Sequence, residues 1–273
     1  MSKSNLITRT ITGLLYGLTL IASLVINYNT FYIFFFIVLV LGLKEFYQLV
    51  EKKDIIPQKN LGFILSLGLY ISSYLIHVNE KMSFFTLNLV LALTFLLFAV
   101  ELFRNKEISF VNIGSTILGI IYVALPLSLL SFLAFDTNNQ YSYHLILSLF
   151  ILVWLSDVGG YFAGVNFGKH KLLERISPKK TWEGVAGGLV LCVIGSSILS
   201  QFFPIMNIYM WLVLGVLVCV SSVIGDLIES MLKRSANIKD SGNILPGHGG
   251  ILDRFDSVLF VIPIVYIFKF FIL

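Results

Sequence analysis

The sequence predicts an all-α, polytopic integral membrane protein with about nine transmembrane helices. Of its 273 residues, 57% are hydrophobic and 12% are charged, which is about half the charged fraction of soluble domains. The mean hydropathy is +0.91. Segments without charge recur along the chain, and roughly 20 mostly apolar residues cross a bilayer as a helix. The lipid bilayer is therefore an expected partner of the chain.

Polar interruptions divide the apolar sequence into spans. The charge-free segment 10–43 is split in two by Asn27-Tyr28-Asn29-Thr30. The segment 184–225 is too long for one helix, and we expect Phe203-Pro204 with Asn207 to divide it. The expected spans are the two halves of 10–43, then about 61–77, 83–100, 111–135 and 143–165, two within 184–230, and 257–273.

The distribution of Lys and Arg predicts the orientation. Among the connections on one side of the membrane, Lys81 is the only Lys or Arg, whereas the other side carries many. Because positive loops stay inside, we expect a plasma-membrane protein with a cytoplasmic N-terminus. Lys269, near the outer end, is the exception and can snorkel to the interface. The long polar connections 166–183 and 231–256 then face the cytoplasm, where nucleotides are found.

No linker or repeat marks a second domain. We therefore expect one membrane domain over 1–273, with scaffold spans in 1–150 and catalytic spans and loops in 151–273. Cys192 and Cys219 lie inside apolar runs without metal-ligand spacing, which favours structural thiols. The net charge of +4 is mild, and no nucleic-acid partner is expected.

Asp226 begins a polar stretch near the cytoplasmic end of the eighth span. On a helix, Asp226, Glu229 and Lys233 share one face. A carboxylate at membrane depth is costly unless a cation or a water-filled cavity supports it. We interpret Asp226 as a metal ligand; the alternative is a plain ion pair with Lys233 or Arg234.

Asp253 and Asp256 are three residues apart at the start of the last span. If that start is helical, the two carboxylates suit one Mg²⁺ or two metal ions that bridge phosphate oxygens. The alternative is that acidic residues stabilise a helix N-terminus. Arg254 between them is a phosphate ligand or a salt-bridge partner of either Asp.

The basic residues before this span have two interpretations. One interpretation is that they are positive-inside anchors; they are Lys233, Arg234 and Lys239. The other is that they form a phosphate cradle together with the glycines of 246–250, because glycine lets backbone N–H groups approach an anion. His248 donates to phosphate, transfers a proton or holds the loop. Asp240 orients Lys239 or a ligand hydroxyl, or has only a loop role.

A second polar segment follows the sixth span. Asp157 is another carboxylate at membrane depth, interpreted as a ligand or metal contact. Lys179 and Lys180 are substrate contacts or topology signals. Small residues recur every fourth position and predict a smooth face for close helix packing; they are Gly160, Gly164 and Gly168.

The residue types narrow the chemistry. No convincing Ser-His-Asp or Cys-His set is present, which disfavours a nucleophilic side chain, and a Walker A motif is absent. Phosphoryl or nucleotidyl transfer needs only positioning and charge neutralisation, because an anionic phosphate can attack directly.

Residues 230–256 closely resemble the C-terminal pattern of the phosphatidate cytidylyltransferases, also called CDP-diacylglycerol synthases. Ser156-Asp157 and residues 177–184 are similar too, so the resemblance covers about 150–260, whereas 1–150 match only in hydrophobic layout. One departure is Gly160, where an alanine is expected before the tyrosine. The pattern is filled by Ser230, Lys233, Arg234, Lys239, Asp240, Gly242, Leu245, Pro246, His248, Gly249, Gly250, Asp253, Arg254 and Asp256.

The resemblance implies transfer of CMP from CTP to phosphatidic acid, giving CDP-diacylglycerol and pyrophosphate, with Mg²⁺ and a second ion, K⁺. By position, it implies metal ligation by Asp226, Asp253 and Asp256. Phosphates would be held by Lys233, Arg234, Lys239 and Arg254. The expected site is completed by Asp157, Lys179, Lys180, Gly249 and Gly250, with Asp240 and His248 as further catalytic candidates.

Other functions remain open at this point. A related transferase would act on an ether-linked or polyprenyl phosphate. A CDP-alcohol phosphotransferase lacks support, because its longer acidic array is missing. A transporter or channel would explain carboxylates at membrane depth but not the glycine-rich loop. The sequence also leaves the oligomeric state open, a homodimer included.

Overall fold

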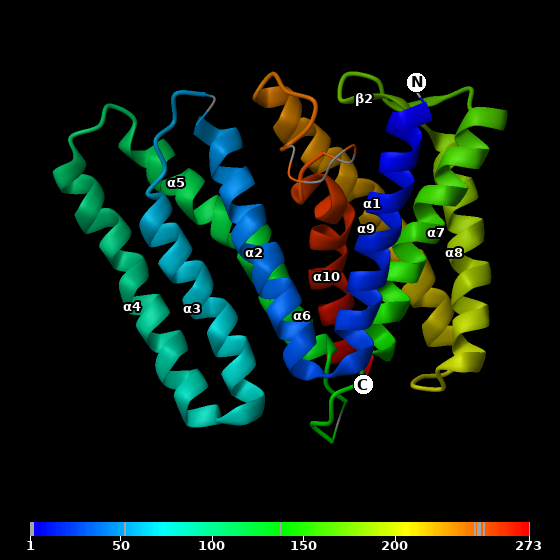
Figure 1. Ribbon diagram of the computed structural model, residues 1–273, viewed down its shortest axis with the longest axis horizontal. Helices are drawn as coiled ribbons and strands as arrows, with labels where there is room; N and C mark the ends of the chain where they lie inside the picture. Colours follow the sequence, from blue (N-terminus) through cyan, green and yellow to red (C-terminus); the bar gives the residue numbers. More distant parts are fainter. Residues whose placement is uncertain are drawn as a thin grey trace. The chain divides into compact units, whose positions relative to one another are not determined.

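The structure, a computed structural model, describes residues 3–51, 53–136, 138–242, 244, 247 and 249–272, with side chains from Thr10 onward. It consists of long helices and one short β-hairpin (Figure 1). In chain order the elements are α1 (Lys3–Ile26), α2 (Tyr28–Glu51), α3 (Lys59–Val78), α4 (Glu80–Arg104), α5 (Ser109–Gly119), the π-helical turn η1 (Ile120–Ala124), α6 (Leu125–Leu133), α7 (His144–Phe167), β1 (Lys171–Leu173), β2 (Ser177–Thr181), α8 (Trp182–Phe202), α9 (Ile208–Ser235) and α10 (Leu252–Ile272).

The predicted all-α polytopic class is confirmed. Within the described part of the chain, eight helical segments are long and apolar enough to cross a membrane: α2, α3, α4, the α5–η1–α6 segment, α7, α8, α9 and α10. α1 adds a shorter apolar stretch, Thr10–Ile26. Each expected span coincides with one of these helical segments.

Several helices extend beyond the apolar runs that predicted them, α2 and α10 among them. α2 continues to Glu51 instead of ending near Leu43, and α10 begins at Leu252 instead of 257. In α2 the added turns bury Phe46 and Tyr47, which are 1% and 0% exposed. Burial of large apolar side chains thus continues the helix past its first charged residues.

The chain divides into two compact units. The first comprises Met1–Phe132 with Asp240–Arg254, and the second Leu133–Lys239 with Phe255–Leu273. α10 therefore begins in the first unit and continues in the second.

In the first unit, α3 and α4 run side by side (Figure 1). A buried polar network joins α4 to its neighbours. Glu101 of α4 is 4% exposed. It accepts hydrogen bonds from Gln58 Nε2 and Arg104 Nη1, both at 2.7 Å, and from Asn112 Nδ2 at 2.9 Å. Three donors on one carboxylate offset the cost of burying its charge. This network was not predicted from the sequence.

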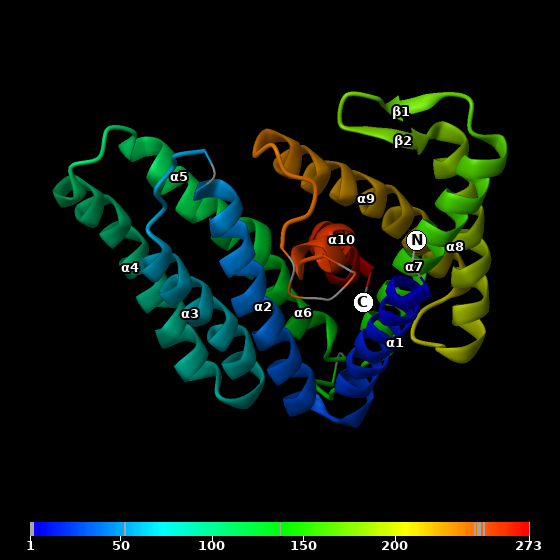
Figure 2. The ribbon, with the colours of Figure 1, turned by 45° about the horizontal axis from the view of Figure 1, so that its top comes forward.

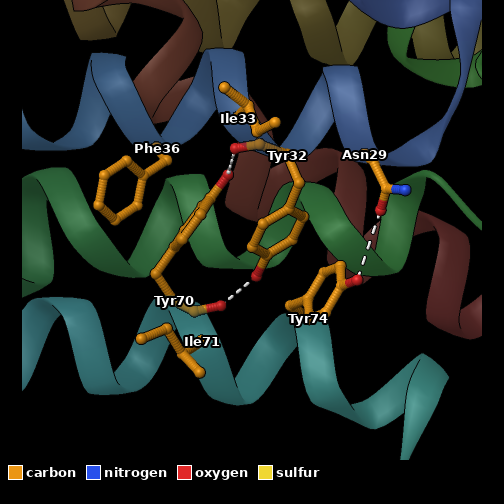
Figure 3. A pocket seen from close by; sticks show the side chains of 7 residues that line it. All are labelled: Asn29, Tyr32, Ile33, Phe36, Tyr70, Ile71 and Tyr74. Atoms are coloured by element: carbon orange, nitrogen blue, oxygen red, sulfur yellow. Dashed lines mark hydrogen bonds between the residues drawn. The ribbon is translucent and has the colours of Figure 1, made fainter.

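A groove between α2 and α3 in the first unit has a volume of about 480 Å³ (Figure 3). Tyr32 and Tyr70 each donate to the other's carbonyl oxygen across it, and the Tyr74 hydroxyl donates to Asn29 Oδ1 at 3.4 Å. Its lining carries no charged side chain, which does not suit a polyphosphate. The groove is lined by Asn29, Tyr32, Ile33, Phe36, Tyr70, Ile71 and Tyr74.

In the second unit, α7 and α8 lie side by side (Figures 1 and 2). Glycines bring their backbones into close contact. A Cβ at Gly159 would lie 2.6 Å from the Gly187 carbonyl oxygen, and one at Gly164 would lie 3.3 Å from Thr181 Oγ1. Of the predicted glycines, Gly164 thus lies in a close contact, whereas Gly160 makes only ordinary van der Waals contact. Gly168 is the C-cap of α7 and not part of its helical face, so the expected stripe of three glycines on one helix was wrong at that position.

A matched pair of variants tests this packing. Gly159→Ala would force two backbones apart, and such overpacking typically costs about 1–3 kcal/mol. At Gly160 a Cβ would lie at an ordinary 3.7 Å from the Gly184 carbonyl oxygen, so Gly160→Ala should be tolerated. Thermal unfolding in detergent should show a lowered melting temperature for the first variant alone. Equal melting temperatures for the two variants would contradict this account.

Candidate functional site

Asp226 lies about two and a half turns before the end of α9 and is half-buried. It forms an ion pair with Lys180 of β2. One turn further along α9, the Ser230 hydroxyl donates to Asp226 Oδ1 at 3.3 Å. Asp226 thus pairs with Lys180, whereas the ion-pair alternative expected Lys233 or Arg234. Lys233 pairs with Glu229, and both of these side chains are largely buried.

The β-hairpin that carries Lys180 connects α7 to α8 (Figure 2). Its strands are antiparallel, with Lys171 opposite Thr181. The Glu183 carboxylate accepts from the backbone N–H groups of Lys169 and His170 at 3.1 and 3.2 Å, and contacts His170 Nδ1 at 2.6 Å. Thr181 caps α8 by accepting from the Gly184 N–H. These bonds hold both ends of the hairpin against the start of α8 and thereby position Lys180.

Asp256 lies in the second turn of α10, in the second unit, and is half-buried. The charges of Asp226, Asp157 and Lys233 are all within electrostatic range of its carboxylate. Three helices, α7, α9 and α10, therefore supply one carboxylate each to the same region of this unit. Their mutual repulsion favours a bound cation or a donor from a ligand.

Gly225 explains how α9 and α10 approach each other beside these carboxylates. A Cβ at Gly225 would lie 2.8 Å from the Phe260 Cβ and 3.0 Å from the Asp256 carbonyl oxygen. Only a residue without a side chain allows this approach. Gly225 was not among the predicted site residues; its place directly before Asp226 was the signal available in the sequence.

A preformed metal cage is not found in the part of the chain that the structure describes. No group of three or more His, Cys, Asp and Glu side chains there is arranged to hold a metal ion. Mg²⁺, however, is usually bound by one or two carboxylates together with water and substrate phosphates. The hard oxygen donors of Asp226 and Asp256 fit that preference, and the predicted metal ligation stays a prediction.

Asp253 belongs to the first unit and contacts the loop before α10. Its Oδ2 atom accepts from the Ser241 N–H at 2.9 Å and from the Gly250 N–H at 2.7 Å. Gly249 has a φ of 84°, and a Cβ there would lie 2.6 Å from Asp253 Oδ2. A glycine at 249 thus permits both the left-handed backbone and the close carboxylate. The sequence predicted the residue types of this contact but not the contact itself.

Most of the remaining predicted residues are exposed at the protein surface. Arg234 Nη1 donates to the Ile238 carbonyl oxygen at 3.2 Å, just beyond the end of α9. Gly250 is buried. His248 lies outside the described residues. The exposed candidates are Asp157, Lys179, Arg234, Lys239, Asp240 and Arg254.

Comparison with known proteins agrees with these features. The sequence model of the Cytidylyltransferase family matches residues 7–272. The chain is 36% identical over 262 residues to a protein named phosphatidate cytidylyltransferase from Staphylococcus haemolyticus (strain JCSC1435), covering 95% of this chain and 97% of the relative. A relative with the same name from Staphylococcus aureus (strain COL) is 38% identical over 208 residues, covering 76% of this chain and 78% of the relative. The chain therefore belongs to the cytidylyltransferase family.

Proposed function

We propose that this protein transfers CMP from CTP to phosphatidic acid, giving CDP-diacylglycerol and pyrophosphate for phospholipid synthesis. The observation that carries the proposal is the Lys180–Asp226 pair, with Asp256 and Asp157 in the same unit of a membrane protein. The names of relatives that match nearly the full chain support the two substrates.

In this reaction a phosphate oxygen of phosphatidic acid forms a bond to the α-phosphorus of CTP. The bond from that phosphorus to the bridging oxygen breaks, and its electron pair leaves with pyrophosphate. The attacking oxygen is already anionic, so no side chain has to remove a proton. The protein's task is to position two phosphates and to offset their charge.

Lys180 is suited to that task. Its ammonium carries three donors, so it can keep its contact with Asp226 and still donate to a phosphate oxygen. Lys233, held by Glu229 one turn away on α9, can act in the same way. The exposed cations Arg234, Lys239 and Arg254 are proposed as further phosphate contacts.

We include Mg²⁺ in the proposal, with K⁺ as a second ion. Asp226 and Asp256 would hold the Mg²⁺, and Asp253 is the further candidate ligand. When bound, this ion would neutralise phosphate charge. Carboxylate oxygens are the ligands that Mg²⁺ prefers, and the repulsion among the carboxylates of the second unit favours a cation there.

The proposed site faces the cytoplasm of a plasma-membrane protein. The support is the asymmetry of Lys and Arg between the two sets of connections, together with the positive-inside rule. CTP would then enter from the cytoplasm, and phosphatidic acid from the bilayer.

Purified protein in lipid nanodiscs, given labelled CTP and phosphatidic acid, should transfer label to lipid when Mg²⁺ is present and stop when EDTA is added. A folded sample that labels no lipid would refute the proposal. Ether-linked and polyprenyl phosphates in the same assay decide between lipid acceptors. Substrate flux into vesicles without CTP turnover would instead support a transporter.

A further inference from the structure

Glu45 is a buried carboxylate of α2 that the sequence did not single out. It is 1% exposed, in the first unit. Its Oε1 atom accepts from the Ile251 N–H at 3.0 Å, and its Oε2 atom accepts from the Leu252 N–H at 2.9 Å and the Ser241 hydroxyl at 3.2 Å. None of the ion pairs found among the described residues involves Glu45. The N–H groups at the N-terminus of α10 stabilise its carboxylate.

The loop before α10 is shaped to admit this carboxylate. A Cβ at Gly242 would lie 2.9 Å from Glu45 Cδ, and one at Gly250 would lie 2.7 Å from the same atom. Both distances are shorter than real Cβ contacts, so the close approach of Glu45 requires glycine at both positions. Two glycines from separate parts of the loop thus fit one side chain of α2.

Glu45 and Asp253 hold the same two backbone segments. Ser241 donates its hydroxyl to Glu45 and its N–H to Asp253. Gly250 donates its N–H to Asp253, and the next residue, Ile251, donates to Glu45. A displacement of either segment away from Glu45 would therefore move the donors that fix Asp253 Oδ2.

We propose that Glu45 is a positioning residue of the transfer reaction, which sets the place of Asp253 by clamping the loop and the first turn of α10. The expected effect on kcat rests on the proposed function, whereas the expected clamping of the loop by Glu45 does not. Misplacement of a reacting group by about 1 Å can cost a hundredfold in rate, so the clamp should affect kcat more than the KM for CTP.

The test uses Glu45→Gln with Glu101→Gln as the matched control. Both are buried carboxylates of the first unit that accept three donors, so both variants lose stability. In Glu45→Gln the new NH₂ group faces a donor, which leaves buried N–H groups unpaired. At a temperature where this variant is folded, we expect its kcat to be about a hundredfold lower than that of the wild type. The kcat of Glu101→Gln should stay within about threefold of the wild-type value.

Hydrogen exchange gives a readout that does not depend on activity. In the full-length protein, exchange at Ser241 and at Gly250–Leu252 should rise selectively in Glu45→Gln and stay unchanged there in Glu101→Gln. If Glu45→Gln does not fold, Ser241→Ala removes one of the three donors and should raise exchange at the same amides to a smaller extent.

Two results would overturn the proposal: unchanged exchange at these amides, or an equal loss of kcat in both Gln variants. A wild-type protein without CTP turnover would refute the proposed function instead, and the exchange result would still decide whether Glu45 clamps the loop.

Discussion

Asp226→Asn is expected to lower the kcat of CTP-dependent transfer by about a thousandfold while the protein stays folded. Asn keeps the shape of the side chain and an oxygen that accepts from Ser230, but it removes the charge that faces Lys180. Loss of that charge removes both a ligand for the proposed cation and the partner that orients Lys180. Radiolabelled CTP turnover in nanodiscs measures the effect.

Asp136→Asn is the matched control for this variant. Asp136 also belongs to the second unit, and its Oδ1 atom accepts from the N–H groups of Asn138 and Gln140 at 2.9 and 2.8 Å. Asn preserves those bonds, and the residue lies between the expected spans 111–135 and 143–165, on the side opposite the Lys- and Arg-rich connections. Turnover should stay at the wild-type rate. Near-full activity of Asp226→Asn, or an equal loss in Asp136→Asn, would remove Asp226 from the site.

Variants of the Lys180–Asp226 ion pair distinguish an effect on stability from an effect on catalysis. Lys180→Met leaves the Asp226 charge without this partner and should cost about 1–2 kcal/mol of unfolding free energy, less than in a dry core because the side chains are 26% and 30% exposed. Adding Asp226→Asn removes the unpaired charge and should restore part of the melting temperature. Turnover should not recover in the double variant, because neither charge is then present.

The helices follow from apolar length, and this is why the spans could be predicted. A span is a property of about 20 consecutive residues, so no distant contact is needed to recognise it. The ends are less predictable, because α2 extends past Lys44 only where tertiary packing buries Phe46 and Tyr47. The same burial places Glu45, which in the sequence is one acidic residue beside a positive loop.

The site was predictable in its residue types and not in its pairings. Asp226 and Lys180 are 46 residues apart in the chain, and their contact depends on a hairpin held by Glu183 and Thr181. The sequence offered Lys233 or Arg234 as the ion-pair alternative for Asp226, and Lys233, seven residues on, lies on the same helix face. In the structure Lys233 forms an ion pair with Glu229, four residues before it on α9.

Asp253→Asn and Asp253→Ala separate the two roles open to Asp253. In the Asp253→Asn variant, the side-chain oxygen can accept from the Ser241 and Gly250 N–H groups, as Asp253 Oδ2 does in the wild type. The loop should therefore keep its wild-type hydrogen exchange. The charge is lost, and we expect kcat to fall about a thousandfold if Asp253 holds a cation or orients a phosphate. Lipid labelling by the purified variants measures kcat, and hydrogen exchange at residues 241 and 250 measures the order of the loop.

Asp253→Ala removes the charge and both loop contacts, so it should lose activity and also expose the Ser241 and Gly250 amides to exchange. If Asp253→Asn keeps near-full activity while Asp253→Ala does not, the loop contacts are its whole contribution and Asp253 is no metal ligand. The proposed ligands would then be Asp226 and Asp256 alone, which agrees with the one or two carboxylates that Mg²⁺ usually takes beside substrate phosphates. If both variants are inactive and only Asp253→Ala loosens the loop, the charge of Asp253 acts on the reaction itself, and the clamp by Glu45 matters because it places that charge.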